Sequence, residues 1–312
     1  MRVATIDIGT NSVLLLVAEA KGGALQPLVE RATITRLGQG VDRTRCLSAE
    51  ASERTLACLS EYARVLREHS IERLDVVGTS AMRDANGGEA FVLRAREILG
   101  VAPRVIDGTE EARLTFIGAL SGLAVSRNVT VFDIGGGSTE IVTGQLNQTG
   151  AHIRSAISLD IGSVRLFERH VRSDPPRAEE MQRVEQDIHE ALAQAPEFEP
   201  NTTLIGVAGT VTQLAALELE LSPYDAARVH GSELTREVVE RLSLRLASLD
   251  LNTRRTLPGM EPSRADVIIV GSAIARAMLS WSGASKLLVS DRGVRWGLAI
   301  ELAGASGSGV SG

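Results

Sequence analysis

The chain has 312 residues, 44% of them hydrophobic and 23% charged, which is typical of a globular protein of about two domains. Its net charge of −6 argues against general nucleic-acid binding, because such proteins are usually basic. The only cysteines, Cys46 and Cys58, form no CxxC pair, so neither a thiolate metal site nor a disulfide framework is expected. No signal peptide is visible, and the apolar run Val13–Ala18 is too short to span a bilayer. We therefore expect a cytoplasmic protein with no nucleic-acid or membrane partner.

The first half of the chain opens on Thr5–Ser12, TIDIGTNS, followed by an apolar run; this pattern predicts a β-hairpin with a tight glycine turn. Ser48–His69 has apolar residues at the spacing of an amphipathic helix, and Ser48 is suited to cap it. Further elements are expected along the chain: a strand at Arg73–Thr79, a helix at Gly88–Leu99, a short strand at Pro103–Ile106 and a helix at Thr109–Leu120 capped by Thr109.

The second half repeats this pattern. Val131–Thr139, VFDIGGGST, matches the first hairpin, and its aspartate lies 126 residues after Asp7. The elements expected after it are helices at Ala178–Ala195, Thr210–Glu220, Glu233–Leu249 and Arg264–Ala277, and strands at Thr203–Gly209 and Leu287–Ser290. Hairpins followed by alternating strands and helices predict α/β domains with helix-covered sheets. The final Gly304–Gly312 is expected to be a flexible tail.

The two glycine turns are suited to bind anions. Glycine lets backbone N–H groups approach an anion closely, and successive N–H groups form an anion-binding concavity. The turns Gly9–Ser12 and Gly135–Ser138 both add side-chain hydrogen-bond donors. The carboxylates beside them, Asp7, Asp133 and Glu140, are suited to hold Mg²⁺, with Mn²⁺ as the alternative, or to position a water molecule. The alternative interpretation is a pair of purely structural β-turns.

Three further features are candidates for function. Glu110 and Glu111 open a helix, where a carboxylate is often only favourable surface chemistry. Arg83 follows a strand and could grip a phosphate, or it could be a surface arginine paired with Asp84. Gly209, in VAGT after another strand, could admit a ligand or serve helix packing.

The segments TIDIGTNS, VVGTSAMRDANGGEAF, VIDGTEEARLTFIGAL, VFDIGGGSTEIV, SLDIGSVRLFERH, GVAGTVTQLAAL and VHGSELT occur in this order. Together they resemble the exopolyphosphatase / guanosine pentaphosphate phosphohydrolase family over essentially the whole chain. The resemblance implies two ribonuclease-H-like domains of the actin/hsp70/sugar-kinase superfamily with an interdomain cleft. We place the domains at residues 1–123 and 124–303, followed by the tail at 304–312. Long relatives carry additional C-terminal domains, so this chain resembles the short form, and a homodimer is common among relatives.

The resemblance also implies roles for individual residues. It makes Glu111 the catalytic base, Arg83 a phosphate-gripping residue, and Asp133 and Glu140 the Mg²⁺-associated carboxylates, with Asp7 as a further metal candidate. The phosphate-binding set, to which we add Gly209, comprises Thr10, Asn11, Ser12, Arg83, Gly135, Gly136, Gly137, Ser138 and Gly209. Because only two lysines are present, the arginines Arg154, Arg165 and Arg169 are expected to line the path of a polyphosphate.

The expected function is hydrolysis of the terminal phosphate of inorganic polyphosphate by metal-assisted attack of water. In such a reaction the protein mainly neutralises charge and aligns the nucleophile. The nearest alternative is a guanosine pentaphosphate 5′-phosphohydrolase using the same site. A kinase of the same superfamily and a non-catalytic polyphosphate or alarmone sensor remain further alternatives; the glutamate of EEARL counts against both.

Overall fold

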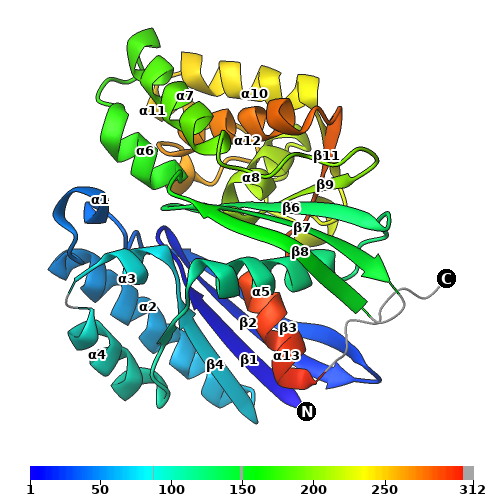
Figure 1. The fold of residues 1–312 in the computed structure, drawn as a ribbon. Coiled ribbons are helices and arrows are strands. Elements are labelled where there is room, and N and C mark those ends of the chain that lie inside the picture. The colour runs from blue at the N-terminus through cyan, green and yellow to red at the C-terminus, as the bar shows by residue number, and fades with distance from the viewer. Residues whose placement is uncertain (87, 148–149, 305–312) are drawn as a thin grey trace. The chain divides into compact units, whose positions relative to one another are not determined.

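The computed structural model describes residues 1–86, 88–147 and 150–304 (Figure 1). The chain divides into two compact units. The first contains Met1–Gly122 and the C-terminal helix, and the second contains Leu123–Leu146 and His152–Arg292. The predicted flexible tail falls on residues 305–312, apart from Gly304, and so lies outside the described residues.

The described part of the first unit is a mixed sheet covered by helices. Its sheet has the order β3-β2-β1-β4-β5, with β1 antiparallel to β2 and parallel to β4. Its elements are β1 (Arg2–Ile8), β2 (Ser12–Lys21), β3 (Ala24–Ile34), α1 (Val41–Thr44), α2 (Ala49–Glu68), β4 (Arg73–Gly78), α3 (Ser80–Asp84), α4 (Glu89–Leu99), β5 (Arg104–Val105), α5 (Gly108–Leu120) and α13 (Val294–Ala303).

Strand β1, in the middle of this sheet, is buried on both faces, and its side chains alternate between the two faces. On β1, Ile6 packs with α2 residues such as Leu59, whereas Val3 packs against Trp296 of α13. Figure 1 shows α13, in red, beside α5, and the two helices are in extensive contact. Residues 294–303 were predicted by chain order to belong to the second domain, but their packing places them in the first unit.

The second unit repeats the strand arrangement. Its sheet has the order β10-β11-β9-β6-β7-β8, in which β6, β9 and β11 are parallel neighbours and β7 is antiparallel to β6. The described elements are β6 (Asn128–Ile134), β7 (Thr139–Asn147), β8 (Gly150–Leu159), α6 (Ser163–His170), α7 (Ala178–Leu192), β9 (Thr203–Val207), α8 (Ala208–Glu218), α9 (Ala226–Val229), β10 (Glu233–Thr235), α10 (Arg236–Ser248), α11 (Leu251–Arg255), a 3-10 turn (Pro262–Arg264), α12 (Ile268–Ser282) and β11 (Lys286–Val289).

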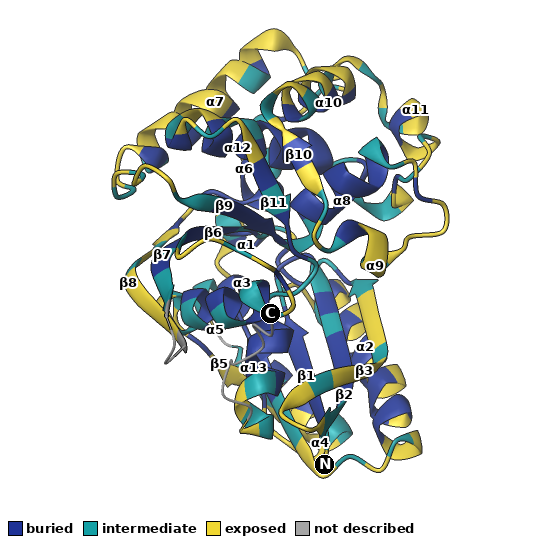
Figure 2. Ribbon diagram, turned by 90° about the vertical axis from the view of Figure 1, so that its right-hand side faces the viewer, coloured by how far each residue is buried: buried dark blue, intermediate teal, exposed yellow. Residues whose placement is uncertain are grey.

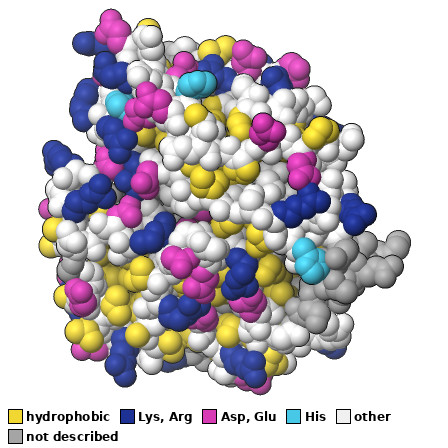
Figure 3. Space-filling model, viewed as in Figure 1, with side chains coloured by type: hydrophobic (Ala, Val, Ile, Leu, Met, Phe, Trp, Pro, Cys, Tyr) yellow, Lys and Arg dark blue, Asp and Glu magenta, His cyan; other side chains and the backbone are white. Residues whose placement is uncertain are grey.

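The predicted fold class is confirmed: each unit is an α/β structure in which a hairpin is followed by parallel strands, as in ribonuclease-H-like domains. Helix α12 of the second unit has eleven of its fifteen residues buried and is largely dark blue in Figure 2, because apolar residues occupy almost every side of it. Charged side chains of both signs are mixed over the face seen in Figure 3, in keeping with the small net charge. Among the described residues, no helix has the length and apolar character needed to cross a membrane.

Two local predictions were wrong. Helix α5 is capped by Asp107, whose side chain accepts a hydrogen bond from the Glu110 N–H at 2.8 Å, and not by Thr109. Residues Glu233–Thr235 form a strand beside β11, and only the following residues form the predicted helix. At the start of α5, the Asp107 carboxylate is better placed than Thr109 to cap the helix. At residues 233–235, pairing with a strand that is distant in sequence outweighs the local helical pattern.

A buried carboxylate at the start of α7 predicts that the stability of the fold falls at acidic pH. Glu180 accepts hydrogen bonds from the Ser173 hydroxyl and from the N–H groups of Arg177 and Arg172, which hold its pKa at about 2, below its ordinary 4.5. Because the folded-state pKa is the lower one, these bonds stabilise the fold fully above pH 4.5 and are lost as the pH falls towards 2.

Glu180→Gln is therefore expected to lower the melting temperature by several degrees at neutral pH, since a charged acceptor of several hydrogen bonds is replaced by a neutral one. Thermal unfolding measured between pH 7 and pH 2 should show the difference from the unmodified protein shrinking at low pH. A constant difference across that range would contradict this role of the carboxylate.

Candidate active site

The turn of the first unit follows β1 at the end of the sheet. The Gly9 N–H donates to the Ser12 carbonyl at 2.9 Å, and a Cβ on Gly9 would lie 3.0 Å from that oxygen, so the turn favours glycine. Behind it, the N–H of Gly38 donates to the Thr10 carbonyl at 2.9 Å, and those of Thr35 and Arg36 donate to the Asn11 carbonyl at 3.0 Å. The carbonyls of the turn are therefore held by one backing segment, residues 35–38.

The turn of the second unit has the same construction. The Gly135 N–H donates to the Ser138 carbonyl at 3.0 Å, and residues 163–165 at the start of α6 hold the other carbonyls. Ser163 N–H donates to the Gly135 carbonyl, Val164 and Arg165 N–H donate to the Gly136 carbonyl, each at 2.9 Å, and the Arg165 Nε donates to the Gly137 carbonyl at 2.5 Å.

Because peptide groups are planar, these hydrogen bonds also determine which way the N–H groups of the turns point. In a trans peptide the carbonyl of one residue and the N–H of the next point to opposite sides. Because the carbonyls of Gly135, Gly136 and Gly137 all point to α6, the N–H groups of Gly136, Gly137 and Ser138 point away from it. Within the described parts of the chain, none of these three N–H groups donates a hydrogen bond to a backbone carbonyl. By the same argument the N–H groups of Asn11 and Ser12 point away from residues 35–38.

The side chain of Asn11 is a further unsatisfied group in the first turn. Asn11 is 6% exposed, and among the described residues neither its amide nitrogen nor its amide oxygen has a hydrogen-bond partner. Buried polar groups are ordinarily hydrogen-bonded, so an unpaired one at a turn with directed N–H groups indicates a ligand position.

The two glutamates at the start of α5 differ in their surroundings. Glu110 binds Arg104 at the surface, in agreement with the surface alternative. Glu111 is 8% exposed, and its Oε2 accepts a hydrogen bond from the Arg83 Nη1 at 2.9 Å. Arg83 Nη1 also donates to the Ile106 carbonyl at 3.0 Å. Arg83 therefore pairs with the predicted base and orients it, whereas the surface alternative paired Arg83 with Asp84.

The carboxylates of the second unit form a cross-strand pair. Asp133 on β6 lies directly opposite Glu140 on β7, which places both side chains on one face of the sheet. Glu140 is 1% exposed and accepts a hydrogen bond from the Ser158 hydroxyl at 2.6 Å. No cluster of three His, Cys, Asp or Glu side chains is found within the described residues. Two carboxylates still fit Mg²⁺, which commonly takes one or two carboxylates together with phosphate oxygens.

Asp7 belongs to the first unit, near the end of β1, and is 8% exposed. Gly209 lies in the first turn of α8, where a Cβ would collide with the guanidinium of Arg264. Because this obstacle is the end of a flexible side chain, the contact leaves both predicted roles of Gly209, ligand binding and helix packing, in place. Of the arginines expected along the polyphosphate path, Arg154 pairs with Glu199, Arg169 pairs with Asp187, and Arg165 lies beneath the Gly135–Ser138 turn.

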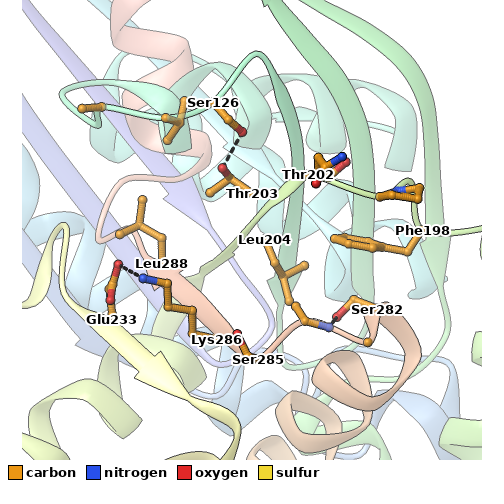
Figure 4. A pocket seen from close by; sticks show the side chains of 16 residues that line it. Ser126, Phe198, Thr202, Thr203, Leu204, Glu233, Ser282, Ser285, Lys286 and Leu288 are labelled. Atoms are coloured by element: carbon orange, nitrogen blue, oxygen red, sulfur yellow. Dashed lines mark hydrogen bonds and ion pairs between the residues drawn. The ribbon is translucent and has the colours of Figure 1, made fainter.

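A cavity of about 620 Å³ lies elsewhere in the second unit (Figure 4). It lies at the amino-terminal ends of β9 and β11, where Thr203 and Lys286 are found, and the Lys286 Nζ binds Glu233 at 2.7 Å. The glycine turn follows the carboxyl end of β6, which runs parallel to β9, so the cavity and the turn are at opposite edges of the sheet. None of the predicted site residues lines this cavity.

Comparison with known proteins identifies the family. The Ppx/GppA phosphatase family model matches residues 16–305. The chain belongs to the Ppx/GppA phosphatase family. It is 38% identical to exopolyphosphatase 2 of Mycobacterium tuberculosis over 97% of this chain and 99% of that protein. Among solved structures, an exopolyphosphatase-like protein matches with a TM-score of 0.91 at 34% identity, covering 97% of this chain and 99% of that one. The Ppx-GppA enzyme of Aquifex aeolicus matches with a TM-score of 0.81 at 36% identity, covering 96% and 99%.

Membership of this Ppx/GppA family confirms the resemblance on which the sequence analysis relied and the expectation of an enzyme that hydrolyses phosphoanhydride bonds. The roles of individual residues are not established by these matches and stay predictions.

Proposed function

We propose that this protein is an exopolyphosphatase, which releases orthophosphate from the end of inorganic polyphosphate. The observation that carries the proposal is the matched pair of turns whose N–H groups are directed away from their backing segments. Rows of N–H groups suit a ligand with anionic oxygens along its whole length, and polyphosphate is such a ligand. The proteins to which the chain is similar, named exopolyphosphatase, support the same substrate class.

In the proposed reaction, Glu111 orients a water molecule and accepts its proton while the water oxygen attacks the terminal phosphorus. A new P–O bond forms, the anhydride P–O bond breaks, and the shortened chain leaves with its oxygen. The N–H groups of the turns hold the non-bridging phosphate oxygens and stabilise their charge as the bond breaks. Arg83 keeps the Glu111 carboxylate in one orientation.

Asp133 and Glu140 would hold Mg²⁺, with Asp7 as a third candidate ligand and Mn²⁺ as the alternative metal. Bound there, the ion would neutralise phosphate charge during transfer. The directed N–H groups alone leave most of a polyphosphate's charge uncompensated, which is why we include the metal in the proposal.

Phosphate release should be measured from polyphosphate of defined length and from guanosine pentaphosphate, each with Mg²⁺ and with EDTA. We expect release from polyphosphate that EDTA abolishes and Mg²⁺ restores. Release from the nucleotide alone would move the assignment to a guanosine pentaphosphate phosphohydrolase. Undiminished release in EDTA would overturn the metal assignment, and binding without release from either compound would favour a sensor.

A further inference from the structure

Arg165 of α6 lies beneath the Gly135–Ser138 turn. The residue is 6% exposed, its Nε donates to the Gly137 carbonyl at 2.5 Å, and its Nη2 lies 3.7 Å from the exposed carboxylate of Asp160. A guanidinium this deeply buried is an unusual choice for the underside of a turn, because removing a charge from water is costly unless hydrogen bonds compensate for it. The burial of Arg165 therefore indicates that its guanidinium holds a neighbouring group in position.

The three carbonyls of the turn are held in different ways. Those of Gly135 and Gly136 accept from backbone N–H groups of residues 163–165, which any non-proline sequence would supply, and the Gly135 carbonyl also accepts from the Ser163 hydroxyl at 3.2 Å. The carbonyl of Gly137 accepts from the Arg165 side chain, and no described backbone N–H outside the regular elements donates to it. The orientation of the Gly137–Ser138 peptide therefore depends on the identity of one side chain.

That peptide carries the last of the three directed N–H groups. With the Gly137 carbonyl fixed towards Arg165, the Ser138 N–H must point to the opposite side, alongside those of Gly136 and Gly137. Without the guanidinium, the Gly137–Ser138 peptide can rotate, since glycine permits many backbone conformations, and the Ser138 N–H no longer adds to the row. Gly162 assists from below: a Cβ there would collide with the backbone of Gly136 and Gly137, so the start of α6 and the turn are in close contact.

We propose that Arg165 is a positioning residue for anion binding, which fixes the Ser138 N–H towards the substrate without touching the substrate itself. This inference rests on the proposed function, because it assigns the anion to the turn. It replaces the expectation that Arg165 lines the path of the polyphosphate, since its Nε is committed to the backbone and its side chain is enclosed.

The test compares Arg165→Ala with Arg172→Ala, a matched control just after the C-terminal end of α6. Arg172 is exposed and its guanidinium donates to the carbonyls of Val171 and Arg169, so its removal deletes a nearby arginine whose hydrogen bonds do not involve the glycine turn. Calorimetric titration with tripolyphosphate measures binding, and phosphate release gives KM and kcat separately. We expect Arg165→Ala to weaken binding and to raise KM by about tenfold or more, with a smaller effect on kcat, because it loses a hydrogen bond made by a charged donor.

Added guanidinium ion at low millimolar concentration separates positioning from general damage to the fold. It should occupy the space left in Arg165→Ala and partly restore tripolyphosphate binding, and it should leave tripolyphosphate binding by Arg172→Ala unchanged. If Arg165→Ala does not fold, Arg165→Lys serves instead: it keeps the charge but loses the planar Nε donor, and we expect weaker binding with unchanged solubility.

Each outcome bears on a different statement. Tripolyphosphate binding by Arg165→Ala, or by Arg165→Lys, equal to that of the unmodified protein would overturn the role of Arg165 alone. If the unmodified protein binds tripolyphosphate but releases no phosphate, the exopolyphosphatase proposal fails, while the binding comparison still decides the role of Arg165. If the unmodified protein does not bind tripolyphosphate at all, both statements are wrong.

Discussion

Replacing Glu111 by glutamine is expected to lower the turnover of polyphosphate by roughly 10²–10⁴-fold and to leave KM nearly unchanged, because general-base assistance contributes about that much to such reactions. Glutamine keeps the shape of the side chain and can still accept a hydrogen bond from the Arg83 Nη1. The variant removes the proton acceptor while retaining the packing around a residue that is only 8% exposed. Initial rates of phosphate release over a range of polyphosphate concentrations measure both quantities.

Glu110→Gln is the matched control for this experiment. It changes the neighbouring residue of the same helix turn in the same way, but the Glu110 carboxylate binds the Arg104 guanidinium at the surface. We expect its turnover to stay within about twofold of that of the unmodified protein, as is usual for a surface substitution. Equal losses in both variants would point to damage at the start of α5, and full activity of Glu111→Gln would remove Glu111 from the role of base.

The parts of this fold that were predictable from the sequence are those determined by short-range interactions. The two Asp-Ile-Gly turns connect strands that pair directly on either side of the turn, Ile8 with Val13 and Ile134 with Thr139. The local sequence pattern is therefore sufficient to predict each hairpin. The long helix α2 begins after Ser48, whose hydroxyl accepts from the Ala51 N–H, as its capping pattern predicted.

Features that depend on distant segments were not predictable in this way. Residues Glu233–Thr235 have a helical pattern, yet they pair with β11, more than 50 residues further along the chain. Helix α13 follows the second unit in sequence but packs on α5 and β1 of the first. The residues it covers lie far earlier in the chain: Leu114 of α5 is 183 positions before Gly297, and Val3 of β1 is 293 positions before Trp296. No local periodicity contains that information.

The same limit applies to the candidate site. The motif containing Arg165 was visible, and arginine chemistry suggested a direct phosphate ligand. Whether a guanidinium faces the ligand or the back of the turn depends on how α6 meets residues 135–137, which the sequence does not state. Glu110 and Glu111 were equally good candidates by their position at a helix start; only the burial of Glu111 and its bond to Arg83 separate them.

The crossing of α5 and α13 leads to the largest expected effect on stability. A Cβ on Gly297 of α13 would collide with the Leu114 backbone, and one on Gly118 of α5 would collide with the Gly293 carbonyl. These obstacles are backbone atoms, which cannot move aside as a flexible side chain can. Gly297→Val is therefore expected to lower the free energy of unfolding by about 3 kcal/mol or more, at the upper end of overpacking effects. Urea denaturation followed by circular dichroism measures the loss.

Catalysis should suffer with stability, because the crossing supports the helix that carries the predicted base. Glu111, Leu114 and Gly118 have the spacing of one face of α5. Forcing α5 and α13 apart at Leu114 is therefore expected to move the Glu111 side chain from its position. Gly297→Ala, the milder change, is expected to remain folded with reduced kcat. The matched control is Gly88→Ala, since Gly88 has ordinary helical dihedral angles and open space where its Cβ would be; we expect its stability to change by no more than about 0.5 kcal/mol. Wild-type stability and kcat in Gly297→Ala would show that α13 can yield at this crossing, and that α5 does not depend on it to place Glu111.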